Sequence, residues 1–220
     1  MNTKPQLLRG SFTLAFVLAG LFLAGGLSAQ DTVRYSSKPG SKIKIEGTST
    51  IHDWTVETTL LGGFMELGPD FPIDPSKNPA PGKVNAKVET LIFVSSIKSG
   101  KKNMDDVMYE TMKQKDFPKI TYKLQGLTLK ETPKPGQPML FDSVGILNVA
   151  GLVTTNALQV TMEPQDNGEK ILVKGNTTLK MTDFGMKPPA PTIGLGLIKT
   201  GDEVKVSFEW FTAKAKAKAP

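Results

Sequence analysis

The 220-residue sequence contains no cysteine and a single histidine, His52. Without cysteine the chain cannot form a disulfide, a thiolate metal site, an iron–sulfur cluster or a thiol nucleophile. With one histidine, a metal site built from several histidines of one chain is excluded as well. A lipoprotein is also excluded, because no cysteine is present to be acylated. Much of the usual enzyme chemistry is therefore absent.

The remaining composition is that of a folded domain. Hydrophobic residues make up 39% of the chain, which is too many for a disordered protein, and glycine shows no collagen-like repeat. The length suits one domain, or at most two, with ample material for a core.

The first 29 residues have the three parts of a secretory signal peptide. Lys4 and Arg9 precede an apolar stretch over 11–26, and Ala29 supplies a small residue at the expected cleavage point. The alternative is an uncleaved membrane anchor, but the apolar stretch is short for a helix that spans a bilayer. We therefore predict that residues 1–29 are removed and that the mature protein is exported, periplasmic or secreted, without stable membrane insertion.

The positive net charge arises mainly at the two ends of the chain. The whole sequence carries a formal charge of +6, to which Lys4 and Arg9 contribute in the leader and three lysines contribute in the segment 213–220. The lysines between the ends are scattered among apolar residues and are not grouped with aromatic residues, as a nucleic-acid-binding face requires. We predict no nucleic acid partner, and a disordered Lys/Ala tail over 213–220.

Most of the mature chain alternates between apolar and polar residues with a period of two. This pattern predicts strands with one buried and one solvated face. The Pro- and Gly-rich stretches between them are expected to be loops within one domain, which covers residues 30–212. About eight strands predict an all-β antiparallel sandwich or barrel. The expected strands include residues 43–45, 54–56, 84–88, 120–124, 139–149, 158–162, 171–181 and 204–210.

One segment, 103–114, has a helical period. Met104, Met108 and Met112 fall on one face, and Asn103 is the expected N-terminal cap. Because methionine repacks easily around a ligand, this helix is suited to plugging or gating one end of a barrel. The aromatic residues of the strands fit either a packed core or a cavity wall, and periodicity does not separate the two.

No arrangement of residues predicts catalysis. Ser49, His52 and Asp53 are close in sequence, but adjacent residues of a strand point to opposite faces and cannot orient one another as a triad. We expect His52 to be a hydrogen-bonded histidine at the rim of the sheet. The tripeptide 183–185 reads DFG, but the chain has no other kinase motif. The sequence predicts no enzyme, no cofactor and no metal site.

Three lysines gather immediately before the helix. Lys98, Lys101 and Lys102 lie where the free N–H groups of a helix N-terminus favour an anion. They are candidates for holding an anionic head group, and the alternative is an exposed basic loop.

Five segments of the sequence carry a resemblance to a known family. The segments are IEGTSTIHDW (45–54), the run from Val94 to Leu124, GILNVAGLVTTNALQV (145–160), MTDFGMKPP (181–189) and KTGDEVKVSFEW (199–210). Together they resemble the YceI family of exported, lipocalin-like bacterial proteins that bind polyisoprenoids, and the resemblance covers about residues 33–212. The helix start differs from that of many members, because MDDVM (104–108) keeps an Asp but lacks their Arg and His.

This resemblance implies an eight-stranded antiparallel, lipocalin-like barrel whose apolar lumen holds a prenyl chain or a similar lipid. The leading hypothesis is a periplasmic carrier of a polyisoprenoid, a quinone or a similar lipid. A filled barrel that binds a partner through its loops and a lipid-modifying enzyme are the alternatives, and both a monomer and a homodimer fit. The inward-facing strand residues expected to line the lumen are Trp54, Ile120, Tyr122, Leu124, Leu158, Val160, Val206 and Phe208.

The signal peptide hypothesis makes a direct prediction about the mature protein. Its N-terminus should lie at or near Gln30, and the protein should fractionate with soluble periplasmic material. Intact mass measurement of protein from the native cell tests this. Full-length chain that stays in the membrane pellet after carbonate washing would contradict it.

Overall fold

The structure is a computed structural model that describes Met1 and residues 32–134, 137–190 and 198–215. The expected signal peptide, apart from Met1, and the last five residues of the expected tail lie outside these ranges. Within them, no helix combines the length and the hydrophobicity needed to cross a bilayer.

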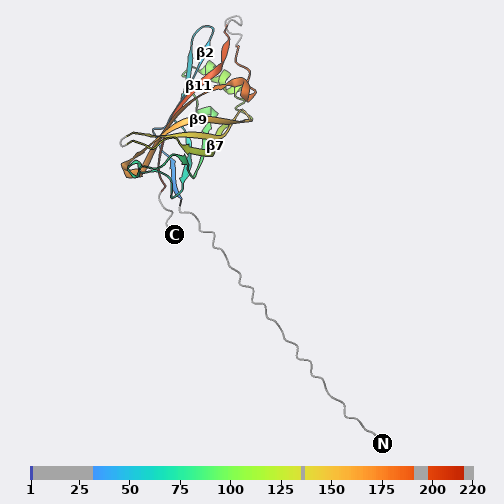
Figure 1. Cartoon of the computed structure of the whole chain (residues 1–220). Helices are drawn as coiled ribbons and strands as arrows, with labels where there is room; N and C mark the ends of the chain where they lie inside the picture. Colours follow the sequence, from blue (N-terminus) through green and yellow to red (C-terminus); the bar gives the residue numbers. More distant parts are fainter. Residues whose placement is uncertain (2–31, 135–136, 191–197, 216–220) are drawn as a thin grey trace.

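The described residues form a single antiparallel sheet of eleven strands with one α-helix, α1 (Lys102–Thr111) (Figure 1). Short 3₁₀ turns lie at η1 (Pro75–Lys77), η2 (Val94–Ser96), η3 (Asp166–Gly168) and η4 (Met181–Phe184). The strands are β1 (Val33–Ser37), β2 (Lys42–Ser49), β3 (Trp54–Thr58), β4 (Gly62–Leu67), β5 (Gly82–Lys83), β6 (Ala86–Phe93), β7 (Lys119–Leu129), β8 (Met139–Val149), β9 (Leu152–Gln165), β10 (Lys170–Lys180) and β11 (Thr200–Lys214).

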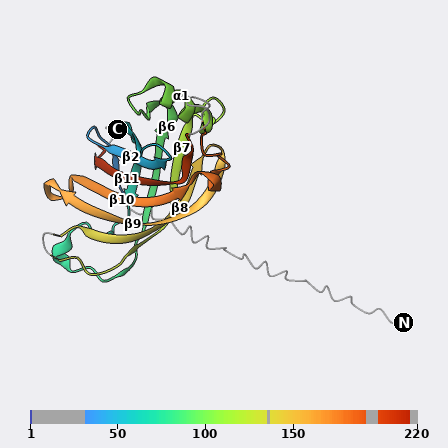
Figure 2. The same ribbon diagram turned by 90° about the horizontal axis from the view of Figure 1, so that it is seen from above.

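Eight of these strands close into a barrel. The order is β1-β4-β6-β7-β8-β9-β10-β11, and pairing of Tyr35 with Lys214 joins β11 back to β1. Seen from above, the strands curve around a common axis and α1 lies at the rim (Figure 2). The predicted all-β, eight-stranded antiparallel barrel with one short helix is confirmed.

Of the remaining strands, β2 and β3 extend the wall at the end where β11 begins, and β5 pairs with the last residues of β7. β2 pairs with the first part of β11, and β1 pairs with its last residues, so β1 and β2 follow one path that breaks at Gly40, where φ is +100°. Likewise, β3 pairs with β2 and β4 pairs with β1, each on the side away from β11. Alternation in the sequence predicted β2 and β3 but missed β1 and β4. On its far side β3 bonds to the segment before α1, where Glu57 and Lys98 exchange backbone hydrogen bonds of 2.8 and 2.9 Å.

Two expected boundaries were wrong. The residue that caps α1 is Lys101 and not Asn103, and it makes no side-chain capping bond. Instead, the carboxylate of Asp105 reaches back and accepts hydrogen bonds from the backbone N–H and the hydroxyl of Ser99, at 2.7 and 2.6 Å. At the other end of the chain, β11 continues to Lys214, two residues into the expected tail.

The barrel is filled at the end where β1 meets β11, which we call the closed end. Tyr35, Met139 and Phe141 are fully buried there, and Phe71 stacks on Phe141 with ring centroids 5.6 Å apart. The hydroxyl of Tyr35 donates a 2.6 Å hydrogen bond to the carbonyl of Gly168, and burial raises the pKa of Tyr35 to about 12. A packed core therefore seals this end.

A second apolar cluster lies at the opposite end, under α1. Met112 packs there with Val94 and Ile97 from the segment before the helix. Met181 and Phe184 of η4 complete the cluster. We call this the helix-bearing end.

The two phenylalanines Phe141 and Phe208 test whether packing differs along the barrel. Phe141→Ala should cost about 3–5 kcal/mol of unfolding free energy, because its ring is enclosed on all sides. Phe208→Ala should cost less than half as much, because this half-buried ring lies farther from the closed end. Urea unfolding of both variants measures the difference. Equal losses would show that the middle of the barrel is packed as tightly as its closed end.

Candidate functional site in the barrel lumen

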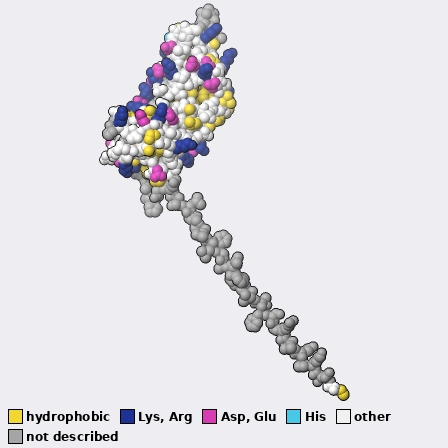
Figure 3. All heavy atoms as spheres, viewed as in Figure 1, with side chains coloured by type: hydrophobic (Ala, Val, Ile, Leu, Met, Phe, Trp, Pro, Cys, Tyr) yellow, Lys and Arg dark blue, Asp and Glu magenta, His cyan; other side chains and the backbone are white. Residues whose placement is uncertain are grey.

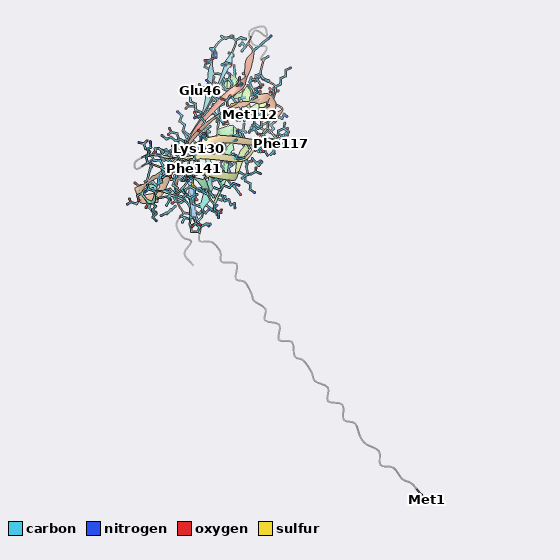
Figure 4. The ribbon with its side chains drawn as sticks, in the orientation of Figure 1. Met1, Glu46, Met112, Phe117, Lys130 and Phe141 are labelled. Carbon is cyan, nitrogen blue, oxygen red and sulfur yellow. The ribbon has the colours of Figure 1, made fainter. Side chains whose placement is uncertain are left out.

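A cavity of about 490 Å³ lies between the two apolar clusters. This volume falls within the range of small-molecule binding sites. Its lining on β11 runs from Thr200 to Trp210, a length of about 33 Å along the strand. Figure 4 labels Phe141 in the lower part of the molecule and Met112 in the upper part. The lumen is thus elongated and hollow between a filled closed end and the helix.

All eight residues expected to line the lumen lie on the cavity wall. They come from four strands, because alternate residues of each strand point to the same face. Their contact with a ligand stays a prediction. The residues are Trp54 on β3, Ile120, Tyr122 and Leu124 on β7, Leu158 and Val160 on β9, and Val206 and Phe208 on β11, joined by wall residues of β8 and β10.

Methionines form the ceiling of the cavity. Met104 and Met108 of α1 and Met112, the residue that caps its C-terminus, line the cavity, as their helical spacing suggested, and Met181 lines it from η4. Phe184, in the middle of the DFG tripeptide, also lines the cavity. Sequence reasoning missed Phe184 and Met181, because a 3₁₀ turn carries neither a strand period nor a helical period.

Lys101 and Lys180 are the charged residues of the cavity lining, and both are exposed; the other polar groups on the lumen wall are few and uncharged. The hydroxyls of Tyr122 and Ser143 are hydrogen-bonded to each other at 2.7 Å, and burial raises the pKa of Tyr122. Thr90, Asn156 and Thr177 add further uncharged groups. The lumen therefore favours an apolar ligand that carries no charge along its length.

His52 lies at the rim of the cavity, as expected. It is exposed, and its Nδ1 donates a 2.9 Å hydrogen bond to the carbonyl of Asp53. Ser49 donates through its hydroxyl to the carbonyl of His52 at 2.7 Å, so the three side chains make no triad. Among the described residues, no group of three His, Cys, Asp or Glu side chains is placed to hold a metal ion.

The three lysines proposed for a head group have different surroundings. Lys101 lines the cavity at its rim. Lys98 donates a 2.6 Å hydrogen bond to the hydroxyl of Tyr109, and this bond raises the pKa of Lys98. Lys102 pairs with Asp106, one turn further along the helix, at 2.5 Å. Head-group binding stays a prediction, and Lys101 is the residue whose position suits it.

Each strand aromatic that lines the middle of the cavity lies over an inward-facing glycine of a neighbouring strand. A Cβ atom built on Gly145 of β8 would come within 2.3 Å of the Tyr122 ring. The same atom on Gly175 of β10 would meet the Phe208 ring at 2.6 Å. These glycines leave room for the rings to lie flat against the wall, so the rings do not project across the lumen.

The third pair, Gly47 and Trp54, shows how a ring is held in this position. A Cβ on Gly47 would lie 2.2 Å from the indole ring, and the indole N–H donates a 3.1 Å hydrogen bond to the carbonyl of Thr48. In the same way, Ser143 holds the ring of Tyr122. The lumen is therefore open because three positions on its wall are glycines, which have no side chain to push the aromatic rings inward.

We expect Gly145→Ala to close part of the lumen. The added methyl group pushes the Tyr122 ring inward, and binding of an apolar fluorescent probe such as diphenylhexatriene should weaken about tenfold, the equivalent of about 1–2 kcal/mol of overpacking. The melting temperature of the empty protein should change little, because the ring moves into empty space.

Gly126→Ala is the matched control, because a Cβ atom at this β7 position has no heavy atom within 4 Å. It should leave probe binding unchanged. The double variant Gly145→Ala/Tyr122→Ala removes the clash and should recover probe binding. Equal probe affinity in Gly145→Ala and the wild type would show that the glycine does not set the width of the lumen.

Comparison with solved structures supports the fold. The chain is similar to a polyisoprenoid-binding domain from Saccharophagus degradans, at 15% identity and a TM-score of 0.62, over 82% of this chain and 98% of that one. It is also similar to BcnA from Burkholderia cenocepacia, at 17% identity and a TM-score of 0.57, over 78% of this chain and 95% of that one. A YceI protein from Campylobacter jejuni matches at 18% identity and a TM-score of 0.51, over 74% and 85% of the two chains.

At these identities the neighbours establish the fold alone. Among curated proteins, no sequence matches the chain. The model of the YceI-like domain, in contrast, matches residues 41–211, which include β2 to β10, β11 as far as Phe211, and all the residues expected to line the lumen. The chain therefore belongs to the YceI-like family.

Proposed function

We propose that this protein is an exported binding protein that carries a long apolar lipid in its barrel lumen. The observation that supports the proposal most directly is the elongated cavity, whose wall is mostly apolar on every strand that contributes to it, apart from a few uncharged polar groups and the exposed Lys101 and Lys180. The polyisoprenoid-binding domain of Saccharophagus degradans shares the fold and is consistent with such a ligand. A polyisoprenoid, a quinone or a similar chain is the proposed cargo.

The physical reason for such a protein is the cost of exposing a hydrocarbon chain to water. Each CH₂ group gains about 0.8 kcal/mol on leaving water, so a long chain does not cross an aqueous compartment at a useful rate without a carrier. The lumen offers a continuous apolar wall from Trp210 to the methionines of α1. A bound chain would fill space that the protein itself leaves empty.

The orientation of the cargo follows from the two ends of the barrel. The closed end is sealed by the packed cluster around Phe141, and polar rim residues lie at the helix-bearing end. We therefore place the apolar end of the lipid toward the closed end and its polar group near Lys101 and His52. Lys101 is positioned to pair with an anionic group, whereas a neutral group needs only the rim hydrogen bonds.

The alternatives receive less support. A barrel filled throughout would show no cavity, and filling is seen here at the ends. A lipid-modifying enzyme would need an acid and a base that converge on the lumen, but His52 at the rim is engaged with backbone groups. We therefore propose binding without catalysis and without a cofactor.

The proposal extends to the ends of the chain and to assembly. We propose that residues 1–29 direct export to the periplasm and are removed, and that the Lys/Ala tail follows β11 as a disordered extension. Both a monomer and a homodimer are compatible with a lumen that one chain forms by itself.

Direct identification of the cargo is the first test. Protein purified from its native cell should release a long-chain lipid into organic solvent, and mass spectrometry of the extract identifies it. Stoichiometry near one lipid per chain is expected from a single lumen. Protein that yields no lipid and does not take up a long-chain polyprenol in vitro would overturn the proposal.

A variant pair tests whether the lipid occupies the lumen. Leu124→Trp adds bulk inside the cavity and should reduce polyprenol uptake by at least about tenfold, while the melting temperature of the lipid-free protein stays nearly unchanged. Val160→Phe, deeper in the lumen, should act in the same direction. Uptake can be followed by tryptophan fluorescence, because both tryptophans of the chain line the cavity.

Val144→Trp is the matched control for Leu124→Trp, because Val144 is exposed on the outer face of the barrel, next to Gly145. It should leave uptake intact. If Leu124→Trp and Val160→Phe both unfold readily instead of blocking uptake, the lumen behaves as a filled core and the carrier hypothesis is wrong.

A further inference from the structure

Four large apolar side chains are exposed around the helix-bearing end of the barrel. We call them the apolar belt: Phe93, Phe117, Leu152 and Val153, with exposed fractions of 46%, 41%, 46% and 58%. Figure 3 shows hydrophobic side chains gathered on one side of the upper part of the molecule, the side on which Figure 4 labels Phe117. Scattered single apolar residues need no explanation, but a contiguous group at one end does.

Contacts between neighbouring segments make the belt contiguous. The Phe117 ring lies against Gly151, where a Cβ would approach it to 2.5 Å, and Gly151 directly precedes Leu152. On the other side, Phe93 of β6 pairs in register with Lys119 of β7, two residues after Phe117. The belt therefore follows the edge of the barrel from β6 across the start of β7 to the β8–β9 turn.

Lysines accompany the belt. Lys113, Lys115 and Lys119 flank Phe117 in a stretch of seven residues that contains one acid, Asp116. All three are exposed, and in the described part of the chain no salt bridge joins any of them to a carboxylate. The ammonium group of Lys119 lies 5.4 Å from the centroid of the Phe93 ring. Aromatic and aliphatic groups are thus interleaved with unneutralised positive charge.

We propose that the apolar belt and its lysines dock the helix-bearing end of the barrel on an anionic membrane surface. Apolar side chains that enter the lipid headgroup region, together with lysines that meet anionic headgroups, are the two components of peripheral membrane binding. The same end carries the methionine ceiling and the polar rim of the lumen. Docking there would bring the cavity next to the membrane from which a lipid is taken or to which it is delivered.

The charge argues for a membrane over a second copy of the chain. A two-fold interface is formed by the same surface on both subunits, so a dimer centred on the belt would bring its lysines toward those of the other copy. An anionic surface neutralises them instead. The inference goes beyond the proposed cargo binding, and the two are measured separately.

Sedimentation with vesicles tests the docking, with the mature, lipid-free protein. Vesicles of phosphatidylcholine with one third phosphatidylglycerol should pull the protein down, and vesicles of phosphatidylcholine alone should do so much less. Binding should fall when the salt concentration is raised from about 50 to 300 mM, because screening weakens the contribution of the lysines. Equal binding to both kinds of vesicle, or none to either, would overturn the proposal.

Substitutions in the belt test its location. Phe117→Ser and Val153→Ser should each lower the vesicle partition coefficient by about fivefold or more, because each removes apolar surface from the headgroup region. Val33→Ser is the matched control, because Val33 is 42% exposed on β1 at the closed end. Phe117 also covers Gly151, so a melting curve accompanies each variant, and Val153→Ser gives an answer even if Phe117→Ser is destabilised.

The contribution of the lysines is tested with two triple variants that each remove three positive charges, at different places on the protein. The triple variant Lys113→Gln/Lys115→Gln/Lys119→Gln should lower binding to anionic vesicles by about tenfold or more, since each lysine near the surface adds to the attraction by anionic headgroups. Lys77→Gln/Lys83→Gln/Lys134→Gln removes the same charge at or near the closed end and should have little effect. Equal losses in the two triple variants would show that net charge, and not this surface, attracts the protein.

Two further outcomes separate this inference from its alternatives. If light scattering shows a dimer that the belt substitutions dissociate, and vesicles do not bind, the belt is an interface between copies and the proposal is wrong. Polyprenol uptake from a detergent-free dispersion is measured on the same variants. Intact uptake with lost vesicle binding supports the docking surface, whereas lost uptake with intact vesicle binding counts against the carrier function alone.

Discussion

The fold depends on the closure of the sheet by a short pairing of β1 with β11. Tyr35, Ser36 and Ser37 pair with the last residues of β11, and the indole of Trp210 donates a 2.7 Å hydrogen bond to Ser37 at the same joint. Without this joint the sheet would expose two strand edges. With it, the sheet has one inward apolar face, and that face must be covered by side chains or by a ligand if it is to be removed from water.

The two ends of the barrel meet this requirement in different ways. Around Phe141 the inward face is covered by the protein's own buried side chains, and close packing of such a core supplies the stability that a hollow protein needs. Further along, the wall leaves a gap, and dispersion contacts are lost on the empty side. Glycines at 47, 145 and 175 keep the gap open, because each lets a neighbouring aromatic ring lie against the wall. One segment of each strand thus contributes to the stability of the fold, and another segment of the same strand lines the space for a ligand.

Much of this arrangement could be predicted from the sequence, and the rest depends on information that alternation does not carry. Strict alternation placed Tyr122 and Phe208 on the inward face, where they lie. β1 was missed because its sequence VRYSS has a single inward anchor, Tyr35, among polar neighbours. Whether the lumen is hollow depends on the register between neighbouring strands. Gly145, for example, widens the lumen only because the register places the Tyr122 ring of the next strand over it. Family resemblance, and not periodicity, predicted the cavity.

The basic segment before α1 has a structural role besides the head-group binding proposed for it. Lys98 donates to the hydroxyl of Tyr109, which lies 2.8 Å from the carbonyl of Ile97, so the helix is tied to the strand-like segment that precedes it. That segment in turn pairs with β3 through Glu57. The helix is therefore continuous with the barrel wall through hydrogen bonds, and the upper limit of the lumen is set by the methionine side chains below it. Because thioether side chains adapt to their surroundings, such a ceiling can fit ligands of different shape without moving the backbone that carries it.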